Sequence, residues 1–343
     1  MNASTGRIRF AVVGCGHIGK RHAAMIGRHP EAELVALCDV LPQEEVGVGA
    51  ETPYFQDLAG MLKAVPGIDV VVVCTPNGVH AEQSIMALEQ GKNVICEKPM
   101  ALTKASAAAV IATAERVGRT VFTVMQNRYS PPSRWIKSLV EEGRLGRIFM
   151  VQINCYWNRD ARYYNANSWK GTEALDGGTL YTQFSHFLDM MYWLFGDITD
   201  IQARFADFDH AGVTEFEDSG LVNFRFLNGG IGAINYSTAV WDRNMESSLT
   251  VIGGKGSVRI GGQYMDRVEY CHIADYEMPE LEPTNAANDY GSYKGSANNH
   301  GAIIDNVINA LKGRNASTTN AMEGMKVVDI IERIYSKRNE RSV

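Results

Sequence analysis

The stretch "AVVGCGHIGKRH" at residues 11–22 decides how the chain begins to fold. An apolar run typical of a buried strand leads into Gly14, Gly16 and Gly19, which have G-x-G-x-x-G spacing. Between a strand and a helix, such glycines permit a tight turn, close approach of the backbone to a pyrophosphate, and close packing of helix on strand. The stretch therefore predicts a dinucleotide-binding turn. The alternative is a glycine-rich turn without a ligand.

An acidic residue stands where a dinucleotide-binding domain needs one. Asp39 ends the next apolar run, "ELVALCD" (33–39), about 20 residues beyond the glycines. Its carboxylate would accept hydrogen bonds from the ribose hydroxyls of NAD and would repel a 2′-phosphate. Val40 and Leu41 follow and offer no arginine for NADP. We therefore predict NAD as the cofactor.

The first 125 residues alternate between strand-like and helix-like segments. Apolar, β-branched runs occur at 8–14, 33–39, 69–75, 92–96 and 120–124, and helical patterns such as 79–90 and 103–118 lie between them. Repeated strand–helix–strand units indicate right-handed crossovers and a parallel sheet. We predict an α/β fold class with an NAD-binding Rossmann domain at residues 1–125.

The pattern changes after Met125. Helices are expected at 132–142, 179–195, 299–312 and 321–337, and a long alternating strand is expected at 147–157. Several strands with glycine-rich turns follow between 198 and 272, and Asn228-Gly229 is a strong hairpin signal. We predict that residues 126–343 form an α+β domain for substrate binding and oligomerisation, built on a large, mostly antiparallel sheet.

Composition excludes several classes of function. The chain has 343 residues and a formal net charge of −6, with no arginine run, so nucleic acid is not an expected partner. None of the six cysteines has C-x-x-C spacing, so no metal site is predicted and a reducing compartment is favoured. The short polar N-terminus is not a signal peptide, and no apolar run reaches membrane-spanning length. We expect a cytoplasmic protein without a membrane partner.

Two segments end strands at the edge where open α/β sheets bind ligands. "CTPNGVH" places Thr75, Pro76 and Asn77 at the cofactor edge, although Asn77 is equally readable as a helix cap and His80 as a structural contact. "VICEKPM" (94–100) ends a buried run in Glu97, Lys98 and Pro99. An ammonium there would hydrogen-bond a substrate hydroxyl and stabilise a developing alkoxide. A surface Lys–Glu pair is the alternative.

These motifs together resemble the glucose–fructose oxidoreductase / inositol dehydrogenase (Gfo/Idh/MocA) family. "LDGGTLYTQFSHFLDMMYWLFG" (175–196) is similar to that family's Gly-Gly-…-His-x-x-Asp helix. The resemblance implies that Lys98 contacts the reacting hydroxyl, that the Lys-Pro peptide is cis, and that His186 is the general acid/base, with Asp189 one turn beyond. Many members carry Asp four residues before this His, where this chain has Thr182. On one continuous helix Thr182 and His186 share a face. Because threonine cannot accept a proton as a carboxylate does, proton transfer is expected to depend on His186 and Lys98.

A closer resemblance is to the UDP-N-acetylglucosaminuronic acid 3-dehydrogenases of bacterial surface-polysaccharide pathways. It is carried by "QNRY" (126–129), "YWNRDARYYNANSWKGTEALDGG" (156–178), "VIGGKGSVRIGG" (251–262) and "SANNHGAIIDNVINALKG" (296–313). Such enzymes oxidise the sugar C3 hydroxyl to a ketone, and an aminotransferase then acts on the product. A uronate needs a cation, for which Arg159 or Lys170 is a candidate, and Arg suits a bidentate pair better.

The resemblance and the motifs define two sets of site residues. For NAD they are Gly14, Gly16, His17, Ile18, Gly19, Asp39, Thr75, Pro76, Asn77, His80, Glu97, Lys98 and Gln126. For the sugar nucleotide they are Lys98, Arg128, Arg159, Tyr163, Tyr164, Trp169, Lys170, Thr182, Gln183, His186 and Asn299. Taken alone, most residues of the second set are also readable as packing or surface residues; for Lys98 the alternative is a surface Lys–Glu pair, and for His186 it is a core histidine on an apolar helix.

Two other functions fit the same sequence. A dehydrogenase of a free polyol or aldose, of the inositol type, would carry the same lysine and histidine. A non-catalytic NAD-sensing regulator is the other alternative, but such proteins are expected to have lost the pair that Lys98 and His186 form here. Family members pair through an open sheet face, so a homo-oligomer, dimer or tetramer, is expected.

Overall fold

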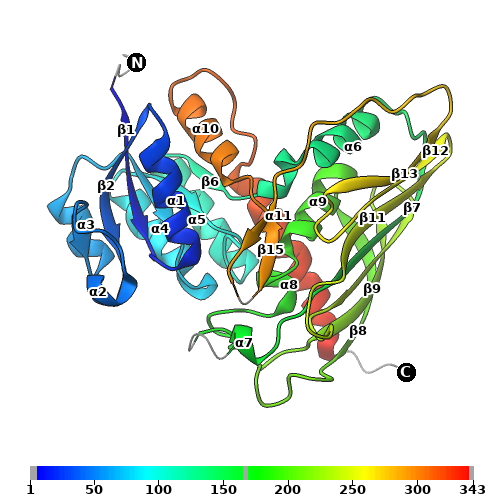
Figure 1. The fold of residues 1–343 in the computed structure, drawn as a ribbon, viewed down its shortest axis with the longest axis horizontal. Helices are drawn as coiled ribbons and strands as arrows, with labels where there is room; N and C mark the ends of the chain where they lie inside the picture. Colours follow the sequence, from blue (N-terminus) through cyan, green and yellow to red (C-terminus); the bar gives the residue numbers. More distant parts are fainter. Residues whose placement is uncertain (1–5, 165–168, 292, 340–343) are drawn as a thin grey trace. The chain divides into compact units, whose positions relative to one another are not determined.

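The computed structural model describes residues 6–164, 169–291 and 293–339 (Figure 1), so residues 165–168 of the quoted motif lie outside it. The chain divides into two compact units, Met1–Met125 with His300–Val328 and Gln126–Asn299 with Asp329–Val343. Helix α11 (Ala321–Tyr335) contributes residues to both. The predicted domains, 1–125 and 126–343, stay a prediction, and the sequence offered no signal for grouping residues 300–328 with the first unit.

The first unit is built on a six-stranded parallel sheet with the order β3-β2-β1-β4-β5-β6. Its strands are β1 (Ile8–Val13), β2 (Ala32–Cys38), β3 (Tyr54–Phe55), β4 (Val70–Val73), β5 (Asn93–Cys96) and β6 (Val121–Thr123). All four valines of β4 are buried, as expected for a strand covered on both faces. The predicted Rossmann sheet is confirmed, and only the two-residue β3 was missing from the predicted strands.

Helices cover this sheet and begin and end at recognisable residues. They are α1 (His17–Arg28), α2 (Gln43–Val46), α3 (Leu58–Ala64), α4 (His80–Glu89), α5 (Lys104–Val117) and α10 (His300–Leu311), with the 3-10 turn η1 (Asn77–Val79) before α4. Helix α1 contacts α10, and α4 contacts α5. Thr103 caps α5 by accepting a hydrogen bond from the N–H of Ser106, and Gly118 ends it in the left-handed region.

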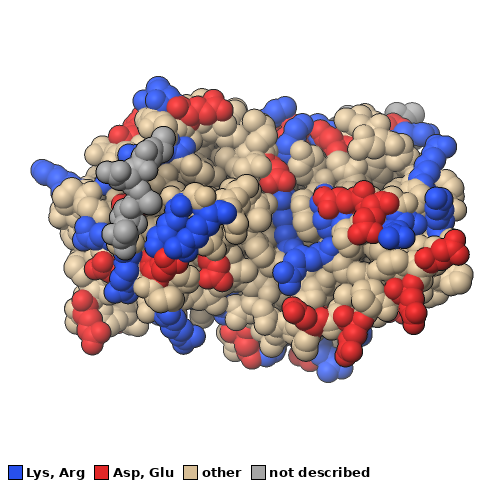
Figure 2. Space-filling view, turned by 90° about the horizontal axis from the view of Figure 1, so that it is seen from above, with Lys and Arg blue, Asp and Glu red and all other residues tan. Residues whose placement is uncertain are grey.

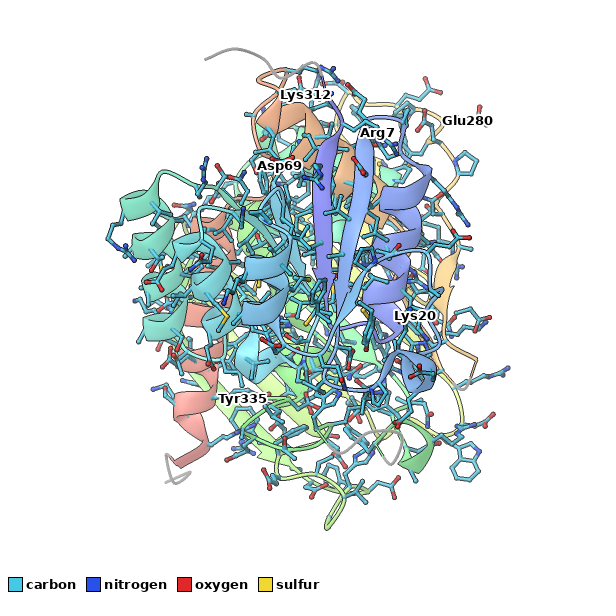
Figure 3. All side chains as sticks on the ribbon, turned by 90° about the vertical axis from the view of Figure 1, so that its left-hand side faces the viewer. Arg7, Lys20, Asp69, Glu280, Lys312 and Tyr335 are labelled. Carbon is cyan, nitrogen blue, oxygen red and sulfur yellow. The ribbon has the colours of Figure 1, made fainter. Side chains whose placement is uncertain are left out.

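The two ends of the parallel sheet differ in what they carry. Arg7 and Asp69 lie where β1 and β4 begin, whereas Lys20, in the first half of α1, lies toward the opposite end (Figure 3). Asp69 accepts a hydrogen bond from the backbone N–H of Arg9 at 2.8 Å and so joins the starts of β1 and β4. The carboxyl ends of the strands lie at the end near Lys20, and the predicted ligand-binding motifs follow the strands at that end.

The second unit is built on a seven-stranded sheet with the order β13-β12-β11-β7-β10-β9-β8. Its strands are β7 (Ile148–Tyr156), β8 (Ile198–Ala206), β9 (Ser219–Phe226), β10 (Ile231–Ser237), β11 (Glu246–Gly253), β12 (Gly256–Gly261) and β13 (Arg267–Ile273). β7 and β10 run parallel and the other neighbours antiparallel, which confirms the mostly antiparallel sheet. The hairpin predicted at Asn228-Gly229 connects β9 to β10. A separate two-stranded sheet is formed by β14 (Ala287–Asp289) and β15 (Lys294–Ala297).

One face of the large sheet packs against α9 (Ser185–Phe195). Trp157, next to β7, meets Phe184 and Phe187 edge to face, with ring centroids 5.3 and 5.7 Å apart. The other helical segments of this unit are η2 (Gln126–Tyr129), α6 (Pro131–Glu141), α7 (Ala161–Tyr164), α8 (Thr179–Thr182) and η3 (Ser336–Asn339). The buried aromatic rings of this layer therefore hold α9 against the sheet.

The continuous helix predicted at 179–195 is wrong. α8 ends at Thr182 and α9 begins at Ser185, so two residues interrupt the helix between Thr182 and His186. The apolar periodicity runs across this break and concealed it. The side-chain hydroxyl of Thr182 instead bonds to Asp176, which precedes the helices.

Charged side chains of both signs are interspersed on the face that Figure 2 shows, in keeping with a modest net charge of −6. Across the described residues, none of the helices combines the length and the hydropathy that crossing a bilayer requires.

Candidate active site

Two of the three glycines after β1 are required by close contacts. A Cβ on Gly14, whose φ is +84°, would lie 2.6 Å from the carbonyl carbon of Cys74, and one on Gly19 would lie 1.8 Å from the carbonyl oxygen of Gly14. A Cβ on Gly16 would meet no atom within 4 Å. Gly16 is the N-cap of α1 and offers no side-chain cap, so the open space lies at a helix N-terminus, where backbone N–H groups bind phosphate. This loop fits a pyrophosphate.

Asp39 follows β2 and is oriented by the glycine loop itself. Its Oδ2 accepts a hydrogen bond from the N–H of Cys15 at 2.7 Å, and its Oδ1 accepts one from the N–H of Leu41 at 3.1 Å. Val40 and Leu41 beside it are exposed and uncharged. A carboxylate held beside the glycine loop suits the ribose hydroxyls of NAD. Neither Val40 nor Leu41 offers a positive charge, so the site disfavours a 2′-phosphate.

His80 joins the segments that follow β4 and β5. Its Nδ1 lies 2.8 Å from the carbonyl oxygen of Pro99 and its Nε2 lies 2.7 Å from that of Thr75. The ring is buried, and burial lowers its pKa. Thr75 donates its hydroxyl to Gln83 at 2.7 Å. Both ring nitrogens of His80 therefore contact the backbone. This geometry agrees with the alternative interpretation of His80 as a structural contact, and contact with NAD stays a prediction.

Lys98 is half-buried at the carboxyl end of β5, and the Lys98-Pro99 peptide is cis, as the family resemblance implied. Glu97 turns its carboxylate inward: the residue is 4% exposed, and its Oε1 lies 2.8 Å from His22 Nε2. Glu97 was predicted among the cofactor-binding residues. The buried contact of its carboxylate with His22 favours a structural role for Glu97. Direct contact of Glu97 with NAD stays a prediction.

In the second unit, His186 lies in the first turn of α9 and is buried. Asp189, one turn beyond, accepts two hydrogen bonds from Arg128, at 2.9 Å from Nε and 2.6 Å from Nη2. Both partners are buried, so this bidentate pair ties η2 to α9 beside His186. Arg128, predicted to contact the nucleotide, thus has its guanidinium engaged with Asp189.

Gln126 and Asn299 also bond to each other. The N–H of Asn299 donates to Gln126 Oε1 at 3.1 Å, and Asn299 Nδ2 donates to the carbonyl oxygen of Gln126 and to Ser130. Both residues are buried. These bonds join the ends of the segment 126–299, and ligand contacts of either residue stay predictions.

Arg159 is the largest side chain among the fully buried residues, at 1% exposed. Its Nε donates to Gln183 Oε1 at 2.7 Å, and its Nη atoms donate to the carbonyl oxygen of Asn158, to Asn244 Oδ1 and to the carbonyl oxygen of Lys294. Four of its five N–H groups are thereby engaged. A bidentate grip on a substrate carboxylate, the preferred sequence interpretation, would require breaking these bonds.

Lys170 has a different environment. It is 9% exposed, and its Nζ lies 3.7 Å from the ring centroid of Tyr163 and 5.2 Å from that of Tyr293. Its hydrogen bond to the carbonyl oxygen of Tyr163 is long, at 3.4 Å. Burial and the Arg159 charge lower its pKa to about 8, against the opposing effect of Asp176. Neither Lys170 nor Arg159 forms an ion pair within the described residues.

Gln183, directly after α8, connects Arg159 to Tyr163, whose ring Lys170 contacts. It accepts from Arg159 and donates its Nε2 to the hydroxyl of Tyr163 at 2.8 Å. The rings of Tyr163, Tyr164 and Tyr293 meet edge to face at 5.0 and 4.9 Å. Trp169 is half-buried and accepts a hydrogen bond from Thr172 through its carbonyl oxygen. Predicted substrate residues from α7, the 169–172 turn and α8–α9 are thus brought together within the second unit.

Sequence reasoning missed several buried polar residues. The carboxylate of Asp176 accepts hydrogen bonds from the hydroxyl of Thr182 and from the N–H of Gly171, so a carboxylate does bond to the threonine that replaces the family's aspartate. Its signal was the "LDGG" segment (175–178), read only for its glycines. His22 and His300 on α1 and α10 contact Glu97, and no local spacing could connect them.

Residues 8–125 match the model of an oxidoreductase family with an NAD-binding Rossmann fold (Gfo/Idh/MocA), and residues 137–343 match the family's C-terminal alpha/beta domain. The chain belongs to this family of NAD-dependent oxidoreductases.

Three relatives illustrate its range. The structure of the WlbA dehydrogenase of Bordetella pertussis, in complex with NADH and UDP-GlcNAcA, is 32% identical, with a TM-score of 0.85 and 98% of each chain covered. The D-glucoside 3-dehydrogenase of Escherichia coli is 26% identical over 96% of this chain and 94% of its own. The inositol 2-dehydrogenase of Rhizobium meliloti is 26% identical over 80% and 82%.

The Gly19→Ala substitution should weaken NADH binding roughly 10- to 100-fold, because overpacking costs about 1–3 kcal/mol and the new Cβ would displace the Gly14 carbonyl. Titration of NADH fluorescence measures the Kd. Gly27→Ala, also in α1, is the matched control, since its Cβ would meet no atom within 4 Å and alanine is the better helix former. Equal affinities in the two variants would contradict the assignment of the loop.

Proposed function

We propose that the chain uses NAD to oxidise a secondary hydroxyl of a sugar that carries a carboxylate. The most specific form of the proposal is oxidation of C3 of UDP-N-acetylglucosaminuronate to the 3-keto sugar, in the cytoplasm, as a step of surface-polysaccharide biosynthesis. The observation that carries it is Lys170, a buried ammonium among tyrosine rings without an ion-pair partner in the described part of the chain.

A buried cation of this kind needs a compensating charge. Removing an ammonium from water is costly, and the pKa of Lys170, lowered to about 8, reflects that cost. A substrate carboxylate would supply the missing charge. Arg159 is less suited, because its N–H groups hold Gln183, Asn244 and the backbone. The similarity to a dehydrogenase whose structure contains UDP-GlcNAcA supports the same substrate class.

The proposed catalytic residues are Lys98 and His186. NAD, when bound, accepts the hydride from the sugar carbon. The Lys98 side chain would hydrogen-bond the reacting hydroxyl and stabilise the developing alkoxide, and His186 would take the hydroxyl proton. Asp189 and Arg128 hold the His186 helix, and Asp176 with Thr182 holds the short helix before it. A free polyol is the alternative substrate, supported by the inositol 2-dehydrogenase relative.

Purified enzyme should form NADH with UDP-N-acetylglucosaminuronate and not at comparable rates with UDP-N-acetylglucosamine, myo-inositol or methyl glucosides. Absorbance at the NADH band measures this without a further oxidant. In a second assay a 2-oxoacid re-oxidises tightly held NADH, and mass spectrometry then measures the 3-keto product. Faster turnover of inositol would favour the free-polyol function. Bound NAD without turnover of any sugar would favour a regulator.

Loss of the Lys170 charge should weaken uronate binding. Lys170→Met should raise the KM for the uronate roughly 10- to 150-fold, because a hydrogen bond to a charged group contributes about 1.5–3 kcal/mol. In the unsubstituted enzyme, KM should rise as the pH increases through about 8, since Lys170 is protonated only below its lowered pKa. That dependence should vanish in the variant. An unchanged KM would show that another group binds the carboxylate.

We also propose that the open face of the large sheet forms a homo-oligomer interface. Met150 pairs in register with Ile231 on one side and Ile252 on the other, and all three are more than 40% exposed. A contiguous apolar row across three strands is the feature that a partner subunit would cover.

Met150→Lys should reduce the oligomer to smaller species, because it buries a charge at the centre of this row. Light scattering after size exclusion measures the mass. Met322→Lys, at an exposed apolar residue at the start of α11, is the control and should leave the mass unchanged. A monomeric unsubstituted protein at micromolar concentration would contradict the interface.

A further inference from the structure

Glu97, the residue before Lys98, is a buried carboxylate with three neighbours of its own. Its Oε1 lies 2.8 Å from His22 Nε2 on α1 and 3.6 Å from His300 Nε2 at the start of α10, and its Oε2 accepts the backbone N–H of Lys98 at 3.2 Å. The His22 and His300 rings meet edge to face at 5.3 Å. His22 is 0% exposed and His300 2%. Helices far apart in the sequence thus converge on one carboxylate.

The surroundings keep this carboxylate ionised. Burial by itself raises the pKa of Glu97, but the hydrogen bond from His22 and the positive charges near it, Lys98 among them, lower it to about 2. Burial lowers the pKa of His300 to about 3, so this ring is uncharged at neutral pH and contributes no cation there. The ionised state of Glu97 at neutral pH therefore depends on His22 and Lys98.

A metal ion is the other possible occupant of such a cluster, since the three ligand atoms lie within 4.8 Å of one another. Two observations favour hydrogen bonding. The 2.8 Å between His22 Nε2 and Glu97 Oε1 is a hydrogen-bond distance. The Nδ1 atoms of His22 and His300 are buried and have no hydrogen-bond partner in the described residues, whereas a metal-bound histidine normally donates its second N–H to one.

We propose that His22 and Glu97 are positioning residues for Lys98, a proposal that rests on the proposed function's assignment of Lys98 to the reaction. His22 Nε2–H holds the Glu97 carboxylate, and this carboxylate holds the backbone of Lys98 and places a negative charge next to its side chain. His80 holds the same turn from α4 through the carbonyl oxygen of Pro99. The lysine is therefore supported from two helices.

Burial keeps the two thiols, His80 and His300 around this turn uncharged at neutral pH, whereas Arg21 on α1 is a cation. Burial raises the pKa values of the Cys74 and Cys96 thiols and lowers that of His80. The groups facing Glu97 and Lys98 are His22 and Arg21 on α1, Cys74 after β4, His80 on α4, Cys96 on β5 and His300 on α10. Glu97 is the anion among them, so its loss should be felt at Lys98.

The test follows acetylation of Lys98 by acetic anhydride as a function of pH in the NAD-loaded enzyme, quantified by mass spectrometry. Glu97→Gln removes the charge, and His22→Leu removes the donor that keeps Glu97 ionised. In both, the midpoint pH of Lys98 acetylation should fall by about 1–3 units, as expected when an opposite charge within a few ångströms is lost. His22→Gln retains an N–H donor and should largely restore the midpoint.

His29→Gln, at a half-buried histidine after α1 that contacts Asp305 and not Glu97, is the control for a histidine-to-glutamine change and should leave the midpoint unchanged. If His22→Leu does not fold, Glu97→Gln and His22→Gln still decide the matter. Identical midpoints in the unsubstituted enzyme and Glu97→Gln would overturn the proposal. So would one equivalent of zinc or another transition metal, measured by elemental analysis and lost in His22→Gln. Because acetylation is measured without a sugar, the outcome does not depend on which sugar is oxidised.

Discussion

The parallel register of four strands brings the motifs of the first unit to one edge. Val13 pairs with Cys38 and with Val73, and Val73 pairs with Cys96. The residues immediately after these four are Gly14, Asp39, Cys74 and Glu97. The glycine turn, the Asp39 carboxylate, the segment after β4 and the lysine turn therefore begin at the same level of the sheet. A register shift of one residue in any strand would turn that motif to the other face.

Three buried cations of the second unit, Arg128, Arg159 and Lys170, differ in the groups that surround their charge. Arg128 and Asp189 neutralise each other in a bidentate pair. Arg159 has neutral partners, carbonyl and amide oxygens, that satisfy its donors without cancelling its charge. Lys170 has aromatic rings and one long hydrogen bond. The donors of Arg159 are thus satisfied, whereas Lys170 has neither an anion nor a full set of hydrogen bonds among the described residues. This difference is why we propose the lysine, and not the arginine, as the group that binds a substrate carboxylate.

Much of the first unit was predictable, because its signals are local. The glycine spacing, the strand periods and Asp39 each lie within a short window, and the structure places them as expected. The second unit was predictable in class but not in detail. The break between Thr182 and Ser185 lies within an unbroken apolar pattern, and the bond from Thr182 to Asp176 depends on a turn that periodicity does not report.

Non-local contacts limited the prediction of the candidate site more than that of the fold. Arg159 and Lys170 were equivalent as residue types, and arginine was preferred for its geometry. Their roles separate only when tertiary partners are known: Gln183, Asn244 and Lys294 engage the arginine from segments up to 135 residues away. The contact of Glu97 with His22 and His300 is likewise non-local, and a single sequence carries no signal for it.

The central position of β7 has a consequence for how the second unit forms during synthesis. β7 (Ile148–Tyr156) is the first strand of its sheet along the chain, yet its two neighbours are β10, starting at Ile231, and β11, starting at Glu246. A ribosome must therefore add some 75 residues before the first partner of β7 exists, and closing so long a loop is slow. During that interval the apolar side chains of β7 and its backbone hydrogen-bonding groups have no partner strand. A nascent chain of this length is therefore expected to be prone to aggregation and to benefit from a chaperone.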